Sequence, residues 1–315
     1  MGDSGTVTQT DIESGLRRLG LNSGDLVFVH SSLSSFGRVE RGADAVVDAI
    51  LNVIGPQGTL AVPTFRYMPE CFDPAETTSV VGRITEVVRL RPNAIRSLHP
   101  THSVAAIGRW AKQLTEGHED THPFGEGSPL HKLYLMDGKL LLLGVTHRTT
   151  SIIHVAEEVA RMPYLDRTRE ARIRTPNGIV RKMVRRPGCS QGFAKIDDEL
   201  ESTRQASRLH IGECLAQLIP ARAIVDTAVD LLQRDPAALL CDRPDCGICA
   251  ESRAKIAAIE AARLEAEYGP IRMDPVRRVV KLLGDADIGD SEGVFHRMSL
   301  TENTEDMTNG ENHTN

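Results

Sequence analysis

His154 is the residue whose type and setting best suit acid–base chemistry in this chain. It follows an apolar run at 140–143 that ends at Gly144, and it lies near the start of a segment with the apolar spacing of a helix. Glu157 and Glu158 come three and four residues later, so either carboxylate can reach the imidazole on one helix face. Such a histidine can act as a general base near neutral pH. A satisfied surface pair explains the same residues, and the pattern leaves both interpretations open.

Two polar stretches offer groups that bind small molecules. Residues 29–37 follow an apolar strand and supply serine hydroxyls and backbone amides for a closely approaching ligand. Residues 96–103 hold an arginine, two histidines and three hydroxyls, a set that suits a phosphate or a carbonyl oxygen. Capped, solvated turns are the simpler explanation of each stretch. No carboxylate accompanies the two histidines, which disfavours a metal site there.

Three cysteines near the C-terminal end form a metal-binding pattern. Cys241, Cys246 and Cys249 follow the spacing Cys-x4-Cys-x2-Cys, with a proline and a glycine that bend the chain between them. Such bends direct thiolates toward one point, as tetrahedral zinc requires, so we expect a structural zinc rather than free thiols. Three ligands are one short of a closed site. The candidates for the fourth ligand are Cys189, His210 and Cys214.

Composition and missing motifs exclude several classes of protein. The 315 residues carry a net charge of −6, which argues against a general nucleic-acid binder and mildly favours cationic substrates. The sequence contains no Walker loop, no Gly-x-Gly-x-x-Gly after a strand, no Gly-x-Ser-x-Gly and no His-Glu-x-x-His. No apolar run reaches the roughly 18 residues of a membrane span, and residues 1–10 do not resemble a signal peptide. We therefore expect a cytoplasmic protein without membrane or nucleic-acid partners.

The elements that must position these residues alternate between strand and helix. Residues 26–30 predict a buried strand, 43–54 a helix and 59–62 a second strand, which together are typical of a parallel crossover. A helix at 11–19, capped by Asp11 or Thr10, precedes them. We expect an α/β fold with a mixed central sheet and flanking helices.

The second half of the chain predicts different elements. Residues 171–184 alternate about a Pro-Asn-Gly turn, which indicates a smaller β-hairpin. Residues 193–218, 223–232 and 250–268 favour helices and give a helical C-terminal part. The polar, acidic residues 285–315 predict a disordered tail. The expected organisation is therefore an N-terminal extension at 1–10, one α/β domain at 11–284 that includes the zinc-bearing part, and the tail.

Six short segments, in the same order, resemble the aminoglycoside N3-acetyltransferase family. This is the family of antibiotic acetyltransferases that is distinct from the GNAT fold, and the resemblance is nearest to its apramycin-acetylating branch. It runs from about residue 10 to about residue 265. The segments are DLVFVHSSLS at 25–34, GPQGTLAVPTF at 55–65, RSLHPTHSVA at 96–105, FGEGSP at 124–129, LLLGV at 141–145 and IHVAE at 153–157.

The resemblance implies an acetyl-CoA-dependent enzyme that acetylates a small-molecule amine by direct transfer, with the 3-amino group of an aminoglycoside as the acceptor. It implies that His154 is the catalytic base and that Glu157, rather than Glu158, is its acidic partner. It also implies a structural zinc whose fourth ligand is Cys189, because Cys189 has a cysteine counterpart in the apramycin branch. We expect a monomer or a homodimer. The residues that the resemblance places against acetyl-CoA are Ser31, Ser32, Leu33, Arg96, His99 and Ser103.

One stretch departs from the family pattern. Aminoglycosides are polycations, and the apramycin branch carries carboxylates shortly before the counterpart of Cys189. Here residues 181–188 are basic, and Arg66 follows the second predicted strand. Two alternatives therefore stand beside the main hypothesis. One is acetylation of another amine, anionic or nucleotide-linked, and the other is a non-catalytic, zinc-stabilised binding protein.

Overall fold

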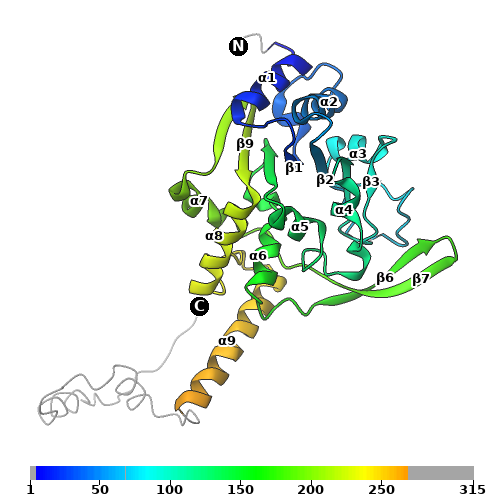
Figure 1. The fold of residues 1–315 in the computed structure, drawn as a ribbon. Helices are drawn as coiled ribbons and strands as arrows, with labels where there is room; N and C mark the ends of the chain where they lie inside the picture. Colours follow the sequence, from blue (N-terminus) through cyan, green and yellow to red (C-terminus); the bar gives the residue numbers. More distant parts are fainter. Residues whose placement is uncertain (1–4, 68, 269–315) are drawn as a thin grey trace, which may run out of the picture. The chain divides into compact units, whose positions relative to one another are not determined.

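The computed structural model describes residues 5–67 and 69–268, and a mixed sheet lies at its centre (Figure 1). Seven strands follow one another in the order β3-β4-β2-β1-β5-β9-β8. Their bounds are β1 Leu26–Ser31, β2 Thr59–Pro63, β3 Ile95–Arg96, β4 Val104–Gly108, β5 Lys139–Leu143, β8 Ser207–Ile211 and β9 Cys214–Pro220. β1 pairs in parallel with β2 and β5, and the other pairs are antiparallel. The predicted parallel crossover and mixed sheet are confirmed.

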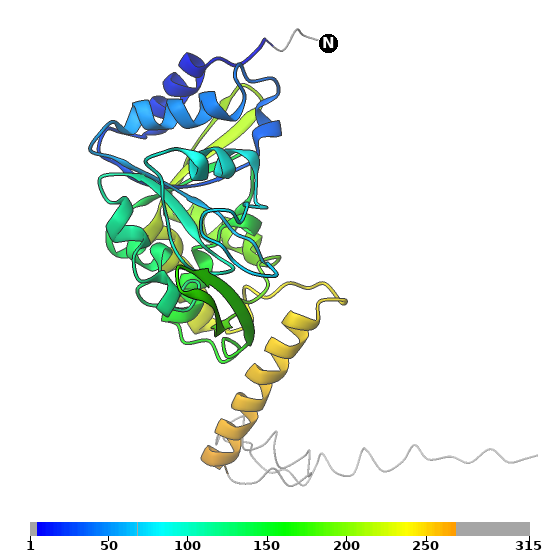
Figure 2. The same cartoon turned by 90° about the vertical axis from the view of Figure 1, so that its right-hand side faces the viewer.

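Alternate residues of each central strand face two separate apolar cores, as the pleat of a strand requires. Val27 and Leu141 pack with α1 (Gln9–Leu19), α2 (Ala43–Ile54) and α3 (Arg83–Leu90) on one face. Phe28 and Leu140 pack on the other face, and helices lie on both sides of the sheet (Figure 2). The helices that cover this second face are α4 Ala111–Thr115, α5 Pro129–Leu135, α6 Ile153–Val159, α7 Asp197–Thr203 and α8 Ala221–Arg234. Strands covered on both faces read as continuous apolar runs, which is why residues 140–143 carry four leucines.

The remaining elements lie outside the sheet. β6 (Thr168–Thr175) and β7 (Gly178–Arg185) form a separate two-stranded antiparallel sheet around a turn at Pro176 and Asn177, and confirm the predicted hairpin. α9 runs from Gly247 to Tyr268 and confirms the last predicted helix. Single-turn helices occupy Leu33–Phe36, His118–Asp120, His147–Thr149 and Phe193–Ile196. The predicted tail at 285–315 lies outside the described residues.

The predicted helix over 193–218 is wrong. The helical part ends at Thr203, where Arg204 takes a left-handed conformation with φ 53°, and β8 and β9 follow. Gly212, with φ 58°, makes the tight turn between these strands. Residues 216–220 of β9 pair with the whole of β5, and this pairing satisfies backbone groups of β5 that would otherwise lie at the edge of the sheet. Tertiary pairing therefore overrides the local apolar spacing.

The first helix begins earlier than the sequence predicts. Thr8, rather than Asp11 or Thr10, is the capping residue: its hydroxyl accepts from the backbone N–H of Asp11, and the Asp11 carboxylate accepts from the backbone N–H of Thr8. This reciprocal arrangement is a capping box, so Asp11 lies in the first turn instead of before it. Within residues 5–67 and 69–268, no helix is long and apolar enough to cross a membrane.

Candidate active site

A pocket of about 510 Å³ lies at the carboxyl ends of the parallel strands. Ser31 ends β1, Pro63 ends β2 and Val145 follows β5, and all three line the pocket together with His154. Carboxyl ends of parallel strands meet at one edge of a sheet, where the chain turns away and leaves room for a ligand. The opposite wall is the segment 186–191, which follows β7.

His154 lines this pocket, and Glu157 is its hydrogen-bonded neighbour outside the lining. Both are on α6, and the Nδ1 atom of His154 lies 2.6 Å from Oε2 of Glu157. Both side chains are buried, so the carboxylate is not screened by water. The imidazole ring stacks on Phe124, with ring centroids 4.9 Å apart, and meets the edge of Phe193 at 4.7 Å. An ionised Glu157 accepts the Nδ1–H, which leaves Nε2 as the basic atom of the neutral imidazole.

Glu158 takes a different partner. Its Oε1 lies 2.8 Å from Nδ1 of His122, a histidine of the loop between α4 and α5. The helix therefore directs two adjacent carboxylates to two different histidines. Of the two acids that sequence spacing offered, the structure joins Glu157 to His154.

Tyr164 completes this buried group, although nothing in the sequence pattern marks it. Its hydroxyl donates to Oε1 of Glu157 over 3.2 Å, and its side chain is 2% exposed. Glu157 thus accepts one hydrogen bond on each carboxylate oxygen. The tyrosine lies seven positions after the glutamate and beyond the end of α6, so no helical spacing connects the two in the sequence.

The serine loop places one of its three predicted residues on the pocket. Ser31 lines it, and its Oγ is buried without a hydrogen-bond partner among the described residues. Ser32 shares a hydrogen bond with the hydroxyl of Ser34 (3.1 Å). Leu33 begins a single-turn helix and packs against the core that contains α1 to α3. Ser31 is therefore the member of this loop with a free hydroxyl at the site.

Arg96, His99 and Ser103 do not line the pocket; they lie behind it. Arg96 donates to the Ser103 hydroxyl at 3.1 Å and to backbone carbonyls, among them that of Thr64 at 3.0 Å. Burial lowers the pKa of Arg96 to about 10. His99 accepts the backbone N–H of His102 through Nδ1. The hydrogen bonds of these side chains stabilise the conformation of the loop. Their predicted contact with acetyl-CoA stays a prediction.

His102 and Thr101 are the residues of this loop that reach the pocket, and sequence reasoning did not single them out. The Nδ1 of His102 lies 2.8 Å from the Thr101 hydroxyl. Its ring meets Phe124 edge-on at 5.3 Å, so one phenylalanine contacts both His102 and His154. Burial and the nearby His154 hold the pKa of His102 well below the usual value, so this second imidazole is neutral.

The charged side chains that line the pocket are all basic. Arg148, Arg169 and Arg186 come from three different segments, and among residues 5–67 and 69–268 no aspartate or glutamate joins them in the lining. Arg148 and Arg186 form no ion pair with another described residue. Their positive charges are therefore available to a ligand.

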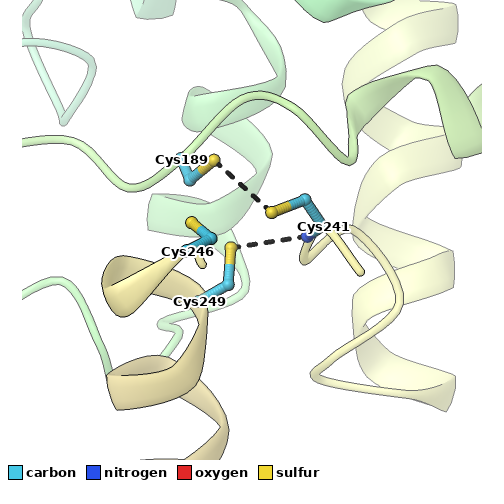
Figure 3. A group of neighbouring side chains, drawn as sticks. All are labelled: Cys189, Cys241, Cys246 and Cys249. Atoms are coloured by element: carbon cyan, nitrogen blue, oxygen red, sulfur yellow. Dashed lines mark hydrogen bonds between the residues drawn. The ribbon is translucent and has the colours of Figure 1, made fainter. Parts of the chain in front are cut away.

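A second cluster lies beside the pocket wall. The Sγ atoms of Cys189, Cys241, Cys246 and Cys249 all lie within 4.8 Å of one another and point toward a common centre (Figure 3). Cys189 also lines the pocket, and its sulfur lies 3.9 Å from that of Cys241. Tetrahedral zinc at about 2.3 Å from each sulfur requires sulfurs about 3.8 Å apart, so the set fits this metal. The other two candidate ligands lie elsewhere: His210 is exposed on β8 and Cys214 is buried on β9.

The protonation of these thiols also suits a metal. Burial raises the pKa of Cys189 and Cys249, whereas the backbone N–H of Cys249 lowers the pKa of Cys246 to about 7. Thiolates crowded together repel one another, and a divalent cation relieves both that repulsion and the cost of their burial.

Comparisons with known proteins agree on one family. A family model described as aminoglycoside 3-N-acetyltransferase matches residues 28–233. Aminoglycoside N(3)-acetyltransferase IV from Salmonella is 33% identical over 229 residues, which cover 71% of this chain and 87% of that protein. The apoenzyme structure of aminoglycoside acetyltransferase AAC(3)-IVa is similar with a TM-score of 0.73 and 30% identity, covering 81% of this chain and 100% of that one. The structure of AAC-IIIb in a binary complex with CoASH is similar with a TM-score of 0.68 and 29% identity, and the match covers 73% of this chain and 97% of that one.

Proposed function

The chain belongs to the aminoglycoside 3-N-acetyltransferase family, and on that premise we propose that it transfers the acetyl group of acetyl-CoA to the 3-amino group of an aminoglycoside, with His154 as general base. The family resemblance predicted from the sequence is confirmed, and the chain is an acyltransferase rather than a binding protein that merely keeps the fold. The observation that carries the catalytic proposal is the buried hydrogen bond between Glu157 and His154, which lines the pocket. A relative solved with CoASH supports acetyl-CoA as the donor.

An aliphatic amine is mostly protonated near pH 7 and has no lone pair for attack on a thioester, so it must first lose its ammonium proton to solvent. Nε2 of neutral His154 then takes a second proton, from the neutral amine, while nitrogen bonds to the thioester carbonyl carbon. Glu157 stabilises the imidazolium that results. When the tetrahedral intermediate collapses, the C–S bond breaks, and the imidazolium returns the proton to the sulfur of the departing CoA. The unpartnered hydroxyl of Ser31 is the candidate donor to the oxyanion.

Release of CoA with an aminoglycoside panel tests this proposal. We expect saturable CoA release with at least one aminoglycoside, acetylated at the 3-amino group by mass spectrometry and NMR of the product. His154→Ala should lower kcat by about 10²- to 10⁴-fold, the usual contribution of a general base. Wild-type rates in the His154→Ala variant would refute the assignment of the base.

The arginine-lined pocket favours a second acceptor class, an amine that also carries a carboxylate or a phosphate. Arg148 and Arg186 attract such a group and repel a polycation, because no described carboxylate lies in the lining to compensate them. Arg186→Met separates the two acceptors. It should raise KM for an anionic amine and lower KM for an aminoglycoside. If Arg186 instead binds the phosphates of CoA, KM for acetyl-CoA rises and the ranking of acceptors stays unchanged.

We also propose a structural zinc at the four cysteines. Cys189, Cys241, Cys246 and Cys249 would hold it, and four protein ligands leave no position for a substrate. Its contribution is the stability of the segment 186–191, which Cys189 ties to the start of α9. We propose further that the enzyme acts in the cytoplasm, as a monomer or homodimer that needs neither nucleic acid nor a membrane.

A further inference from the structure

The Glu157 carboxylate is enclosed on every side that the described residues show. His154 faces one oxygen at 2.6 Å and Tyr164 faces the other at 3.2 Å. A methyl group placed on Gly188 would lie 3.8 Å from both oxygens, so the backbone of the 186–191 segment covers the carboxylate. Glu157 is 1% exposed. A buried carboxylate needs a hydrogen bond on each oxygen, because water cannot supply one.

We propose that Tyr164 is a positioning residue for the acetyl transfer: its hydroxyl holds Glu157 in the orientation that fixes His154 with Nδ1 protonated and Nε2 free. This inference rests on the proposed function and adds a residue to it. Tyr164 does not line the pocket, so it acts through Glu157 and not on the substrate.

The surroundings of Tyr164 make it a fixed donor. Its ring packs in a small apolar cluster with Leu165, Leu240, Cys241 and Cys249. Its hydroxyl donates to Oε1 of Glu157 and makes no other hydrogen bond among the described residues.

Loss of this hydroxyl changes the proton affinity of the pair formed by His154 and Glu157. The hydrogen bond from Tyr164 stabilises the pair more when the pair carries a net negative charge than when His154 is protonated. Loss of this hydrogen bond therefore raises the pKa at which the pair gains a proton. The other charged or titratable groups near the pair are His102, Arg186 and Glu158 with its partner His122. Tyr164→Phe leaves all of them in place.

The first experiment is the pH dependence of kcat/KM for Tyr164→Phe in the full chain. The ring and its packing remain, and only the O–H is lost. We expect the acidic limb to move up by about half a unit to one unit, so that kcat/KM at a fixed pH on that limb falls about three- to tenfold, because one unit is a tenfold change in the protonated fraction. KM for acetyl-CoA and the thermal midpoint should change little. Tyr134→Phe is the matched control. The Tyr134 hydroxyl donates to Asp226 at 2.9 Å, and neither of these residues lines the pocket.

A double variant tests the direction of the hydrogen bonds. In Glu157→Gln the amide oxygen must face the Tyr164 hydroxyl, because a buried hydroxyl has no other acceptor. The amide NH₂ then donates to Nδ1 of His154 and places the proton on Nε2, the wrong atom for a base. Adding Tyr164→Phe frees the amide to rotate. We therefore expect the double variant to be faster than Glu157→Gln alone by about threefold or more.

An NMR titration distinguishes failure of this inference from failure of the proposed function. The ¹³Cε1 resonance of His154, assigned with His154→Ala, reports its protonation without substrate. An upward shift of its titration in Tyr164→Phe supports the inference even if every acceptor proves inactive. An unchanged titration, an unchanged acidic limb or a double variant no faster than Glu157→Gln overturns it.

Discussion

Glu157→Gln is the substitution for which the structure gives the sharpest expectation. The change keeps the size of the side chain and removes its charge. Glu157 accepts two hydrogen bonds, from Nδ1–H of His154 at 2.6 Å and from the Tyr164 hydroxyl at 3.2 Å, and glutamine has only one oxygen with which to accept them. The Tyr164 O–H has no other acceptor among the described residues, so we expect the amide oxygen to stay with Tyr164 and the NH₂ to turn to His154. The imidazole then carries its proton on Nε2.

Two effects add in this variant. A hydrogen bond to a charged group stabilises by about 1 kcal/mol more than a hydrogen bond between neutral groups. Lost from the transition state, this free energy lowers the rate by a factor of roughly five. The reversed tautomer removes general-base catalysis itself, which contributes about 10²- to 10⁴-fold. We therefore expect kcat to fall by at least about a hundredfold, with KM for acetyl-CoA nearly unchanged because Glu157 does not line the pocket.

Glu158→Gln is the matched control for this measurement. It makes the same chemical change one residue away, at a carboxylate that pairs with His122 and not with His154. Initial rates of CoA release should stay within about twofold of the wild type, as for a residue outside the reacting groups. Equal losses in the two variants, or a Glu157→Gln enzyme that keeps a third of wild-type kcat, would contradict the assignment of Glu157 as the partner of the base.

Two further expectations follow from groups outside this pair. Elemental analysis of the purified chain should find about one zinc per chain. Cys246→Ser should remove the zinc and lower the thermal midpoint by several degrees. Cys71→Ser, at a cysteine outside the cluster, should keep both the zinc and the thermal midpoint. Burial lowers the pKa of His30 and of His118 to about 3, below the value of about 6.5 in an unfolded chain. The unfolded state therefore binds more protons between these values, so stability is complete above about pH 6.5 and is lost as the pH falls, by about 2 kcal/mol per histidine at pH 5. A thermal midpoint that stays constant from pH 7.5 to 5 would contradict the burial of both histidines as neutral groups.

The parts of the fold that local pattern determines were predictable. Residues 140–143 are apolar on both sides because helices cover both faces of β5, and the run predicts a buried strand. The hairpin at β6 and β7 follows from its turn residues and alternation. β9 was missed because its strand character depends on pairing with β5, which lies more than sixty residues earlier, and β8, which pairs with β9, was missed with it.

The candidate site divides in the same way. His154 and Glu157 are three residues apart on one helix, so spacing alone brought them together. Tyr164 lies beyond the end of that helix, and Cys189 lies 52 residues before Cys241, so folding alone brings these side chains to their partners. Arg96 donates to backbone carbonyls of Thr77 and Thr64, contacts that no sequence spacing reveals, and its predicted contact with acetyl-CoA stays a prediction.

The pocket is built from two parts with different physical origins. The chemical part, with Ser31 and His154, stands on parallel strand ends and α6, whose apolar residues are buried in the two cores and cannot change without loss of stability. The facing part is the segment 186–191, which carries Arg186 and is held by Cys189 in the cysteine cluster. The Arg186 side chain is exposed and belongs to neither apolar core, so it can change without opening a cavity in them. Arg186 and its neighbours can therefore alter the choice of amine while the reaction at His154 stays the same.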